Sequence, residues 1–200
     1  LAAEQIDGVA LAIYQIEHGG ALIIGDQTGV GKGRQAAAII RYAVLNGKKP
    51  IFVTEKPHLF SDLYRDLNAI GSGGLNPLII NDKSNSSDPT ITDEEGNVIY
   101  KSPQPGVKKS ILDSMQIPKN YDYAVITYSQ LSAGEGKVSR KKDYFRSVAN
   151  NNIVVMDESH NAGGEGNTNA YLLDILPTTK GVVFLSGTFA KRPENIPIYS

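Results

Sequence analysis

The sequence predicts an α/β fold in which a mostly parallel central sheet is flanked by helices on both faces. Short apolar runs bounded by glycine, proline or polar residues are typical of buried parallel strands. Runs of this kind occur at 21–25, 50–54, 123–127, 152–157 and 181–186, with a further candidate at 78–80. Helical stretches lie between most of them. This alternation favours a parallel sheet, because each crossover must pack back onto the sheet with a right-handed sense.

Apolar residues at helical spacing predict the helices in the first half of the chain. The first helix is amphipathic, with apolar residues separated by 3, 4 and 3 positions at Ile6, Val9, Ile13 and Ile16, and it ends at Gly19-Gly20. A second helix spans 32 to about 45. A third is one-sided, with leucines and an isoleucine at spacings of 4, 4 and 3 at Leu59, Leu63, Leu67 and Ile70.

Length and composition are those of one globular domain, which we assign to residues 1–200. The segment 81–120 is polar and rich in Ser, Asp, Pro and Lys, and we interpret it as an insertion in which Glu94-Glu95-Gly96-Asn97 turns a small hairpin. The chain begins at Leu1 rather than Met, so we expect it to be a fragment of a longer protein.

Charge and residue usage exclude several classes of protein. A balance of 20 Lys+Arg against 21 Asp+Glu gives a net charge of −1, so any polyanion site must be local. With no cysteine and 3 histidines, disulfides, thiolate catalysis and cysteine-ligated zinc are excluded. No apolar run approaches the ~18 residues that span a bilayer, and a basic signal start is absent. We expect an intracellular protein without membrane contact, cytoplasmic if bacterial or phage-encoded.

A glycine-rich loop follows the first strand and opens a helix. It reads Gly25-Asp26-Gln27-Thr28-Gly29-Val30-Gly31-Lys32-Gly33-Arg34. Glycines let backbone N–H groups surround phosphate oxygens, the helix N-terminus adds a positive dipole, and the lysine reaches the β and γ phosphates. The alternative is a glycine-rich turn with an exposed lysine.

The loop departs from the standard phosphate-loop pattern at two positions. Asp26 replaces the first glycine, and Gly33 replaces the serine or threonine whose hydroxyl binds Mg²⁺. Mg²⁺ would then depend on Asp157, phosphate oxygens and water. We therefore expect weaker Mg²⁺ binding than in a Gly33→Thr variant.

Two further polar clusters end buried strands. In Asp157-Glu158-Ser159-His160, the first carboxylate suits Mg²⁺ and the second suits the activation of an attacking water, although such acids also cap helices. Ser186-Gly187-Thr188 closes the last strand and by itself is only a turn. Because ligands of open α/β sheets bind at the carboxyl ends of strands, we expect all three clusters to converge on one crevice.

These clusters resemble the first RecA-like lobe of superfamily 2 helicases and translocases, which has a P-loop NTPase fold. Residues 25–32 look like motif I, residues 157–160 like the D-E-x-H box of motif II, and residues 186–188 like motif III. The strawberry notch group and helicase-methylase proteins of phages and plasmids are the most similar, since their loop also continues as G-K-G-R. The resemblance covers the chain except 81–120.

The resemblance implies ATP and Mg²⁺ as cofactors and a role for each motif residue. Lys32, Asp157 and Glu158 would be catalytic, with Asp157 at the metal, and Gln5 would read adenine or simply be a surface glutamine. The nucleotide would contact Gln5, Asp26, Gln27, Thr28, Gly29, Val30, Gly31, Lys32, Gly33 and Arg34. Coupling would fall to His160, Ser186 and Thr188, and nucleic-acid contact to Thr54, Lys56, Thr127 and Tyr128. The run Arg140-Lys141-Lys142 either extends that surface or is a solvated helix face.

The function implied is that of the ATP-binding lobe of a helicase or translocase, with DNA a better candidate than RNA. A second RecA-like lobe of the same polypeptide, absent from these 200 residues, would supply an arginine finger worth ~10³–10⁵ in rate. The isolated lobe is therefore expected to be nearly inactive. Two alternatives remain, a nucleotide-dependent regulatory or partner-docking module and a viral packaging ATPase.

Overall fold

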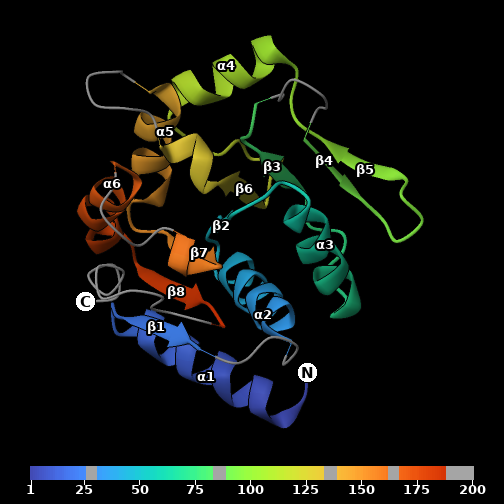
Figure 1. The fold of residues 1–200 in the computed structure, drawn as a ribbon, viewed down its shortest axis with the longest axis vertical. Coiled ribbons are helices and arrows are strands. Elements are labelled where there is room, and N and C mark those ends of the chain that lie inside the picture. The colour runs from blue at the N-terminus through green and yellow to red at the C-terminus, as the bar shows by residue number, and fades with distance from the viewer. Residues whose placement is uncertain (26–30, 83–88, 133–138, 162–166, 188–200) are drawn as a thin grey trace.

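Six parallel strands form the central sheet, in the spatial order β1-β8-β7-β2-β6-β3 (Figure 1). The computed structural model describes residues 1–25, 31–82, 89–132, 139–161 and 167–187. The strands are β1 (Ala21–Ile24), β2 (Ile51–Thr54), β3 (Pro77–Ile79), β6 (Tyr123–Thr127), β7 (Ile153–Asp157) and β8 (Gly181–Leu185). Each neighbouring pair is parallel, which confirms the predicted α/β class.

Helices cover both faces of this sheet. They are α1 (Ala3–Glu17), α2 (Lys32–Leu45), α3 (Leu59–Ala69), α4 (Pro105–Ser114), α5 (Arg140–Ala149) and α6 (Asn167–Ile175), with short 3₁₀ turns η1 (Tyr128–Leu131), η2 (Ser159–Asn161) and η3 (Leu176–Thr178). Apolar side chains of α1, α2 and α3 fill one core, and those of α4, α5 and α6 fill the other. None of the helices in the described residues has the length and apolar character needed to cross a bilayer.

Alternating strand side chains supply both cores, which is why the strands are apolar throughout. In β2, Ile51 and Val53 face the core under α4 to α6, and Phe52 faces the core under α1 to α3. All three side chains are at most 3% exposed. A strand buried on both faces needs no polar positions, so the continuous apolar runs in the sequence follow directly from this architecture.

The segment between β3 and β6 contains a hairpin and a helix. Strands β4 (Thr90–Thr92) and β5 (Val98–Lys101) pair antiparallel, and the turn is closed by a 2.7 Å hydrogen bond from Asn97 N to Asp93 Oδ1. This confirms the predicted hairpin turn. Helix α4 adds Ile111 and Leu112 to the core, so this part of the segment is integrated into the fold. Its status as an insertion stays a prediction.

Parallel strands bring their carboxyl ends to one edge of the sheet. At this edge β2 ends at Thr54, β6 at Thr127 and β7 at Asp157, while Gly25 follows β1 and Ser186 follows β8. Side chains from distant parts of the sequence therefore meet at this edge, where they form the candidate site.

Candidate functional site

Helix α2 presents its N-terminus at this edge and begins at Lys32. Its N-cap, Gly31, has φ 77° and ψ 34°, a left-handed conformation that a residue with a Cβ adopts only at a cost. The glycine thus lets the chain enter the helix, whose N-terminus carries the partial positive charge that suits a phosphate. The predicted contacts Asp26, Gln27, Thr28, Gly29 and Val30 lie outside the described residues.

Gln5 of α1 lies against the start of this helix. A Cβ built on Gly31 would come within 2.0 Å of Gln5 Nε2, so the amide occupies the space that a side chain at position 31 would need. Gln5 Oε1 also accepts a 2.9 Å hydrogen bond from Ala2 N. The structure therefore brings Gln5 to the phosphate loop, as the resemblance implies, and its contact with adenine stays a prediction.

Asp157 is the most strongly perturbed acid of the site. Burial, together with the negative charge of Glu158, raises its pKa to about 6. A 3.1 Å hydrogen bond from Thr54 Oγ1 to Asp157 Oδ2 and the positive charge of Lys32 act in the opposite direction. Lys32 is therefore close enough to Asp157 to act on its charge. Gly33, the residue after Lys32, lines the same small cavity as Asp157, so the start of α2 and this acid lie at one site.

Glu158 has a backbone φ of 47°, which is uncommon for a residue other than glycine. Such conformations cost on the order of 1–3 kcal/mol and cluster at functional sites. Here the turn directs Glu158 Oε2 toward His160, whose Nδ1 lies 3.3 Å away. His160 Nδ1 is also 2.9 Å from Ser186 Oγ.

The imidazole of His160 thus lies between the acidic pair and the end of β8. This is the arrangement expected if His160 and Ser186 couple the state of the nucleotide to the rest of the protein. That role stays a prediction, and Thr188 lies outside the described residues.

Asp66 of α3 is a residue of this site that sequence reasoning missed. A Cβ built on Gly33 would lie 2.0 Å from Asp66 Oδ2, so the carboxylate occupies the space of the side chain that Gly33 lacks. Gly33, Asp62, Asp66 and Asp157 line one small cavity of about 40 Å³. Burial raises the pKa of Asp66, against the charge of Arg34, whose Nε is 3.8 Å from Asp66 Oδ1. Arg34, predicted to contact nucleotide, pairs with this acid.

The donor set suits magnesium bound together with a nucleotide. In the described residues, no group of three or more His, Cys, Asp or Glu side chains is placed to hold a metal ion. Mg²⁺ does not need such a group, because it commonly uses one or two carboxylates, phosphate oxygens and water. Asp157 supplies one carboxylate, and Asp66 lies on the wall of the same cavity.

The four residues predicted to contact nucleic acid differ in exposure. Thr54, Thr127 and Tyr128 are buried and hydrogen bonded within the protein, Thr54 to Asp157 Oδ2 and Tyr128 to the Asp157 carbonyl oxygen at 2.8 Å. Lys56 is exposed and lies 4.0 Å from a Glu55 carboxylate oxygen. The Thr54 and Tyr128 contacts position the acidic pair, and polymer contact by any of the four stays a prediction.

The Asp66 contact changes what we expect from restoring a hydroxyl at position 33. A Gly33→Thr substitution alone places its side chain on Asp66 Oδ2, so the carboxylate must move to another rotamer; we expect this to lower the free energy of unfolding by about 1 kcal/mol at most and to weaken Mg²⁺-dependent nucleotide binding. The double variant Gly33→Thr/Asp66→Ala should recover both quantities. Urea denaturation and Mg²⁺ titration of nucleotide binding measure them, with Asp66→Ala as the matched control. Tighter Mg²⁺ binding by the single variant would contradict this account.

Comparisons with known proteins agree with this geometry. The family model described as "P-loop containing NTP hydrolase pore-1" matches residues 2–199. Comparison with curated protein sequences gives no match. The fold is similar to that of the UvsW helicase from bacteriophage T4, with a TM-score of 0.62 and 14% identity over 98% of this chain and 55% of that one.

Two other solved structures share the fold. One is the SWI2/SNF2 ATPase core domain of Sulfolobus solfataricus, with a TM-score of 0.57 and 16% identity over 92% of this chain and 30% of that one. The other is a nuclease-deletion mutant of the Type ISP restriction-modification enzyme LlaGI in complex with a DNA substrate mimic, with a TM-score of 0.65 and 15% identity over 100% of this chain and 16% of that one. This chain thus spans about half or less of each.

The family match covers nearly the whole chain, and the site shows the features that such a family requires. A glycine-capped helix begins at a lysine, and the parallel strand β7 ends at a half-buried aspartate that a glutamate follows. The chain belongs to the P-loop NTP hydrolases of the pore-1 family, with a RecA-like fold shared by superfamily 2 helicase cores.

Proposed function

We propose that this chain is the ATP-binding lobe of a nucleic-acid-dependent ATPase of the helicase or translocase type, similar to the strawberry notch group. The observation that carries the proposal is that the start of α2 and the end of β7 meet at one cavity, which Gly33, the residue after Lys32, lines together with Asp157. The NTP hydrolase family and the fold of the helicase cores support it.

Each residue has a role that its environment suits. Lys32 and the N-terminus of α2 bind the β and γ phosphates. Asp157, held by Thr54, would hold Mg²⁺, which when bound would supply positive charge to the phosphates. Glu158 orients and deprotonates the attacking water. His160 Nδ1 contacts both Glu158 Oε2 and Ser186 Oγ, and so links the acidic pair to the end of β8.

Hydrolysis in this scheme is completed by a second RecA-like lobe. The chain spans 55% of UvsW and smaller shares of the other two structures. We propose that a second lobe of the same polypeptide closes over the nucleotide and brings an arginine finger, which is worth ~10³–10⁵ in rate. Movement along DNA would then follow from opening and closing of the two lobes.

The polymer dependence of ATP hydrolysis tests this function. In the full-length protein, we expect hydrolysis to rise on addition of single-stranded DNA, duplex DNA or RNA, with DNA the stronger activator. The assay measures phosphate release at saturating ATP and Mg²⁺. Hydrolysis that no polymer changes would contradict the helicase or translocase proposal and favour a nucleotide-dependent regulatory module.

Lys32→Ala should weaken ATP binding. A hydrogen bond to a charged group is worth about 1.5–3 kcal/mol, which corresponds to roughly 10-fold to 100-fold in affinity. Binding of a fluorescent ATP analogue measures the loss. Lys48→Ala is the matched control, because Lys48 precedes β2 and lies at the opposite edge of the sheet, where Nζ donates to Asn151 O at 2.9 Å. If both variants bind the ATP analogue with equal affinity, Lys32 does not contact the nucleotide.

A further inference from the structure

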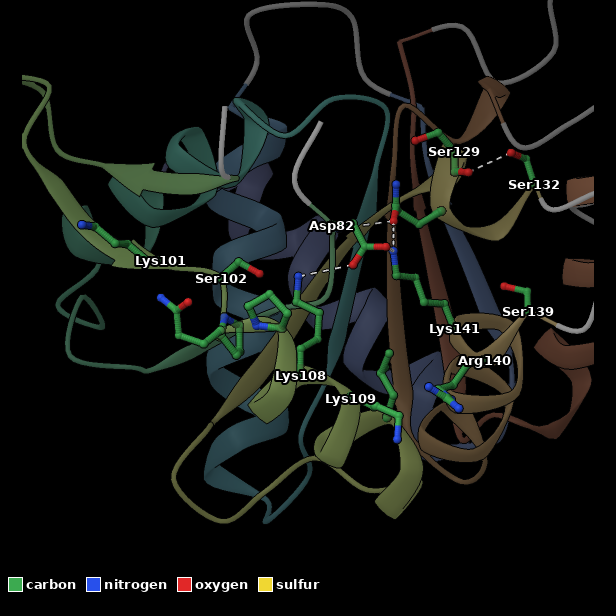
Figure 2. A pocket seen from close by; sticks show the side chains of 15 residues that line it. Asp82, Lys101, Ser102, Lys108, Lys109, Ser129, Ser132, Ser139, Arg140 and Lys141 are labelled. Carbon is green, nitrogen blue, oxygen red and sulfur yellow. Dashed lines mark hydrogen bonds and ion pairs between the residues drawn. The ribbon is translucent and has the colours of Figure 1, made fainter. Parts of the chain in front are cut away.

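A second, larger cavity of about 760 Å³ lies beyond the carboxyl ends of β3 and β6 and shares no lining residue with the small cavity at Gly33. Figure 2 shows the side chains that line it. Its walls come from η1, from the chain between β5 and α4, and from the first turns of α4 and α5. The segment 81–120 therefore builds one side of it. The other side includes η1, which comes directly after Thr127 at the end of β6.

The described lining of this cavity is strongly basic. Five basic side chains, Lys101, Lys108, Lys109, Arg140 and Lys141, accompany a single acidic one, Asp82. They make up a quarter of the 20 Lys+Arg in a chain whose net charge is −1. With so large a share of the positive charge in one concave site, the local electrostatic potential attracts anions, although the net charge of the chain is close to zero.

Four of these five cations form an inner pair, Lys108 and Lys141, and an outer pair, Lys109 and Arg140. Figure 2 shows Lys108 and Lys141 directed at Asp82 from opposite sides, and both side chains are largely buried. Burial alone would raise the pKa of Asp82, but the hydrogen bond and charge of Lys141 and the charge of Lys108 lower it. The outer pair, Lys109 and Arg140, has side chains 64% and 51% exposed.

The outer pair shares a single acidic neighbour. Lys109 Nζ and Arg140 Nε lie 3.6 and 2.9 Å from the two carboxylate oxygens of Asp113. Exposed ion pairs of this kind contribute little to stability. Two half-exposed cations on one exposed acid retain the capacity to bind another anion.

Neutral donors complete the lining. Helices α4 and α5, each of 10 residues, begin at the cavity with Pro105 and Arg140, so two positive helix ends are directed at the same space. Hydroxyls line the cavity at Ser102, Ser129, Ser132 and Ser139. Cations, helix N-termini and serine hydroxyls are the groups that hold nucleic-acid phosphates.

We propose that this cavity binds the phosphate backbone of the nucleic acid on which the protein acts. The inference rests on the proposed function and assigns the polymer to Lys101, Lys109 and Arg140 rather than to the buried Thr54, Thr127 and Tyr128. None of the described lining residues is aromatic, so bases have no stacking surface there. Binding is therefore independent of sequence and falls steeply with salt.

Hydrogen bonds also connect this cavity to the acidic pair Asp157 and Glu158. Lys108 Nζ donates to the carbonyl of Asn81, whose side chain bonds Thr127 Oγ1 and N at 2.9 and 3.0 Å. Ser129 on the cavity wall follows Tyr128, which donates to the carbonyl of Asp157. A phosphate bound against η1 thus acts next to a side chain that holds the acidic pair.

Polymer binding by two matched double variants of the full-length protein tests the proposal. Lys101→Ala/Lys109→Ala removes two charges from the cavity, and Lys119→Ala/Lys180→Ala removes two from the opposite edge, just before β6 and β8. Fluorescence anisotropy with labelled single-stranded and duplex DNA gives the Kd over a range of salt concentrations. Thermal unfolding followed by circular dichroism verifies that both variants are folded.

We expect the cavity variant to bind at least 10-fold more weakly and to lose about 2 from the slope of log affinity against log salt, one per phosphate contact. The control variant should match the wild type. If the wild type binds DNA and the cavity variant binds it with the same affinity as the control variant, this inference is overturned and the proposed function stands. A wild type that binds no nucleic acid would overturn both, and cavity-dependent binding of poly-glutamate in its place would indicate an acidic protein partner.

Discussion

Replacing Glu158 by Gln is expected to lower ATP hydrolysis by roughly 100-fold to 10,000-fold, the range that a general base contributes. Nucleotide binding should change little, because Lys32, Asp157 and the N-terminus of α2 remain. The amide keeps the length of the side chain and its contact with His160, 3.3 Å away in the wild type, but it cannot accept a proton from water. Single-turnover hydrolysis and equilibrium binding of ATP by the full-length protein separate the two effects.

A matched control for this variant is Glu55→Gln. Glu55 follows β2 at the same sheet edge, is exposed, and lies 4.0 Å from Lys56 Nζ. Its neutralisation removes the same charge without touching the acidic pair, so hydrolysis should match the wild type, and the free energy of unfolding should change by no more than about 0.5 kcal/mol. A Glu158→Gln enzyme as active as this control would exclude Glu158 as the base.

The fold was largely predictable because its strands are buried on both faces. Continuous apolar runs as short as those of β6 and β7, bounded by polar residues and glycine, favour a doubly covered strand over a helix. The helical spacing of apolar residues was a less reliable guide to burial in α1. Ile6 fits the predicted apolar face of α1 but is 53% exposed, because the face that packs inward is set by Val9, Ala12 and Ile16.

The site was predictable only where its residues are contiguous in sequence. Lys32 and the pair Asp157-Glu158 stand in recognisable local patterns, and parallel strands bring their ends together. Asp66 has no such pattern, since it reaches Gly33 only through the packing of α3 on α2. The helical period could have indicated that Asp62 and Asp66 share a face, but no local signal shows what that face meets.

Two of the residues expected at the nucleic-acid surface have a contact that the sequence did not indicate. Thr54 ends β2 and Tyr128 follows β6, and both hydroxyls donate to Asp157. The basic run at 140–142 was ambiguous in the sequence, because a charged helix face is usually just solvated. Arg140 and Lys141 line one cavity together with Lys101 and Lys109, and this tertiary arrangement could not be predicted from either segment alone.

Asp157→Asn is expected to stabilise the nucleotide-free protein at pH 8 while abolishing its response to Mg²⁺ and ATP. The pKa of Asp157 is about 6 in the folded protein against an ordinary value of 3.8, so the folded protein holds this proton more tightly than the unfolded chain does. Below about pH 4 both states are protonated and the residue has no effect on stability. As the pH rises from 4 to 6 the unfolded chain releases its proton first, and stability falls.

Above pH 6 the folded state carries the full cost of a buried carboxylate, on the order of 2–3 kcal/mol for a shift of about two pKa units. Asparagine mimics the protonated acid and keeps an oxygen that accepts from Thr54 Oγ1. In EDTA at pH 8 the variant should therefore unfold several degrees higher than the wild type, at roughly 2–4 °C per kcal/mol. The difference should shrink toward zero as the pH approaches 4.

Addition of Mg²⁺ and ATP should reverse the order at pH 8. A ligand that binds only the folded state adds RT ln(1 + [L]/Kd), about 2.7 kcal/mol at one hundred times Kd, and Asp157 is the acid through which we expect this gain. The wild type should therefore gain the larger increase in melting temperature, while Asp157→Asn gains little. If the variant is no more stable than the wild type in EDTA, the carboxylate is not strained by burial. If both proteins respond equally to Mg²⁺ and ATP, the metal binds elsewhere, and the buried charge of Asp157 serves another purpose.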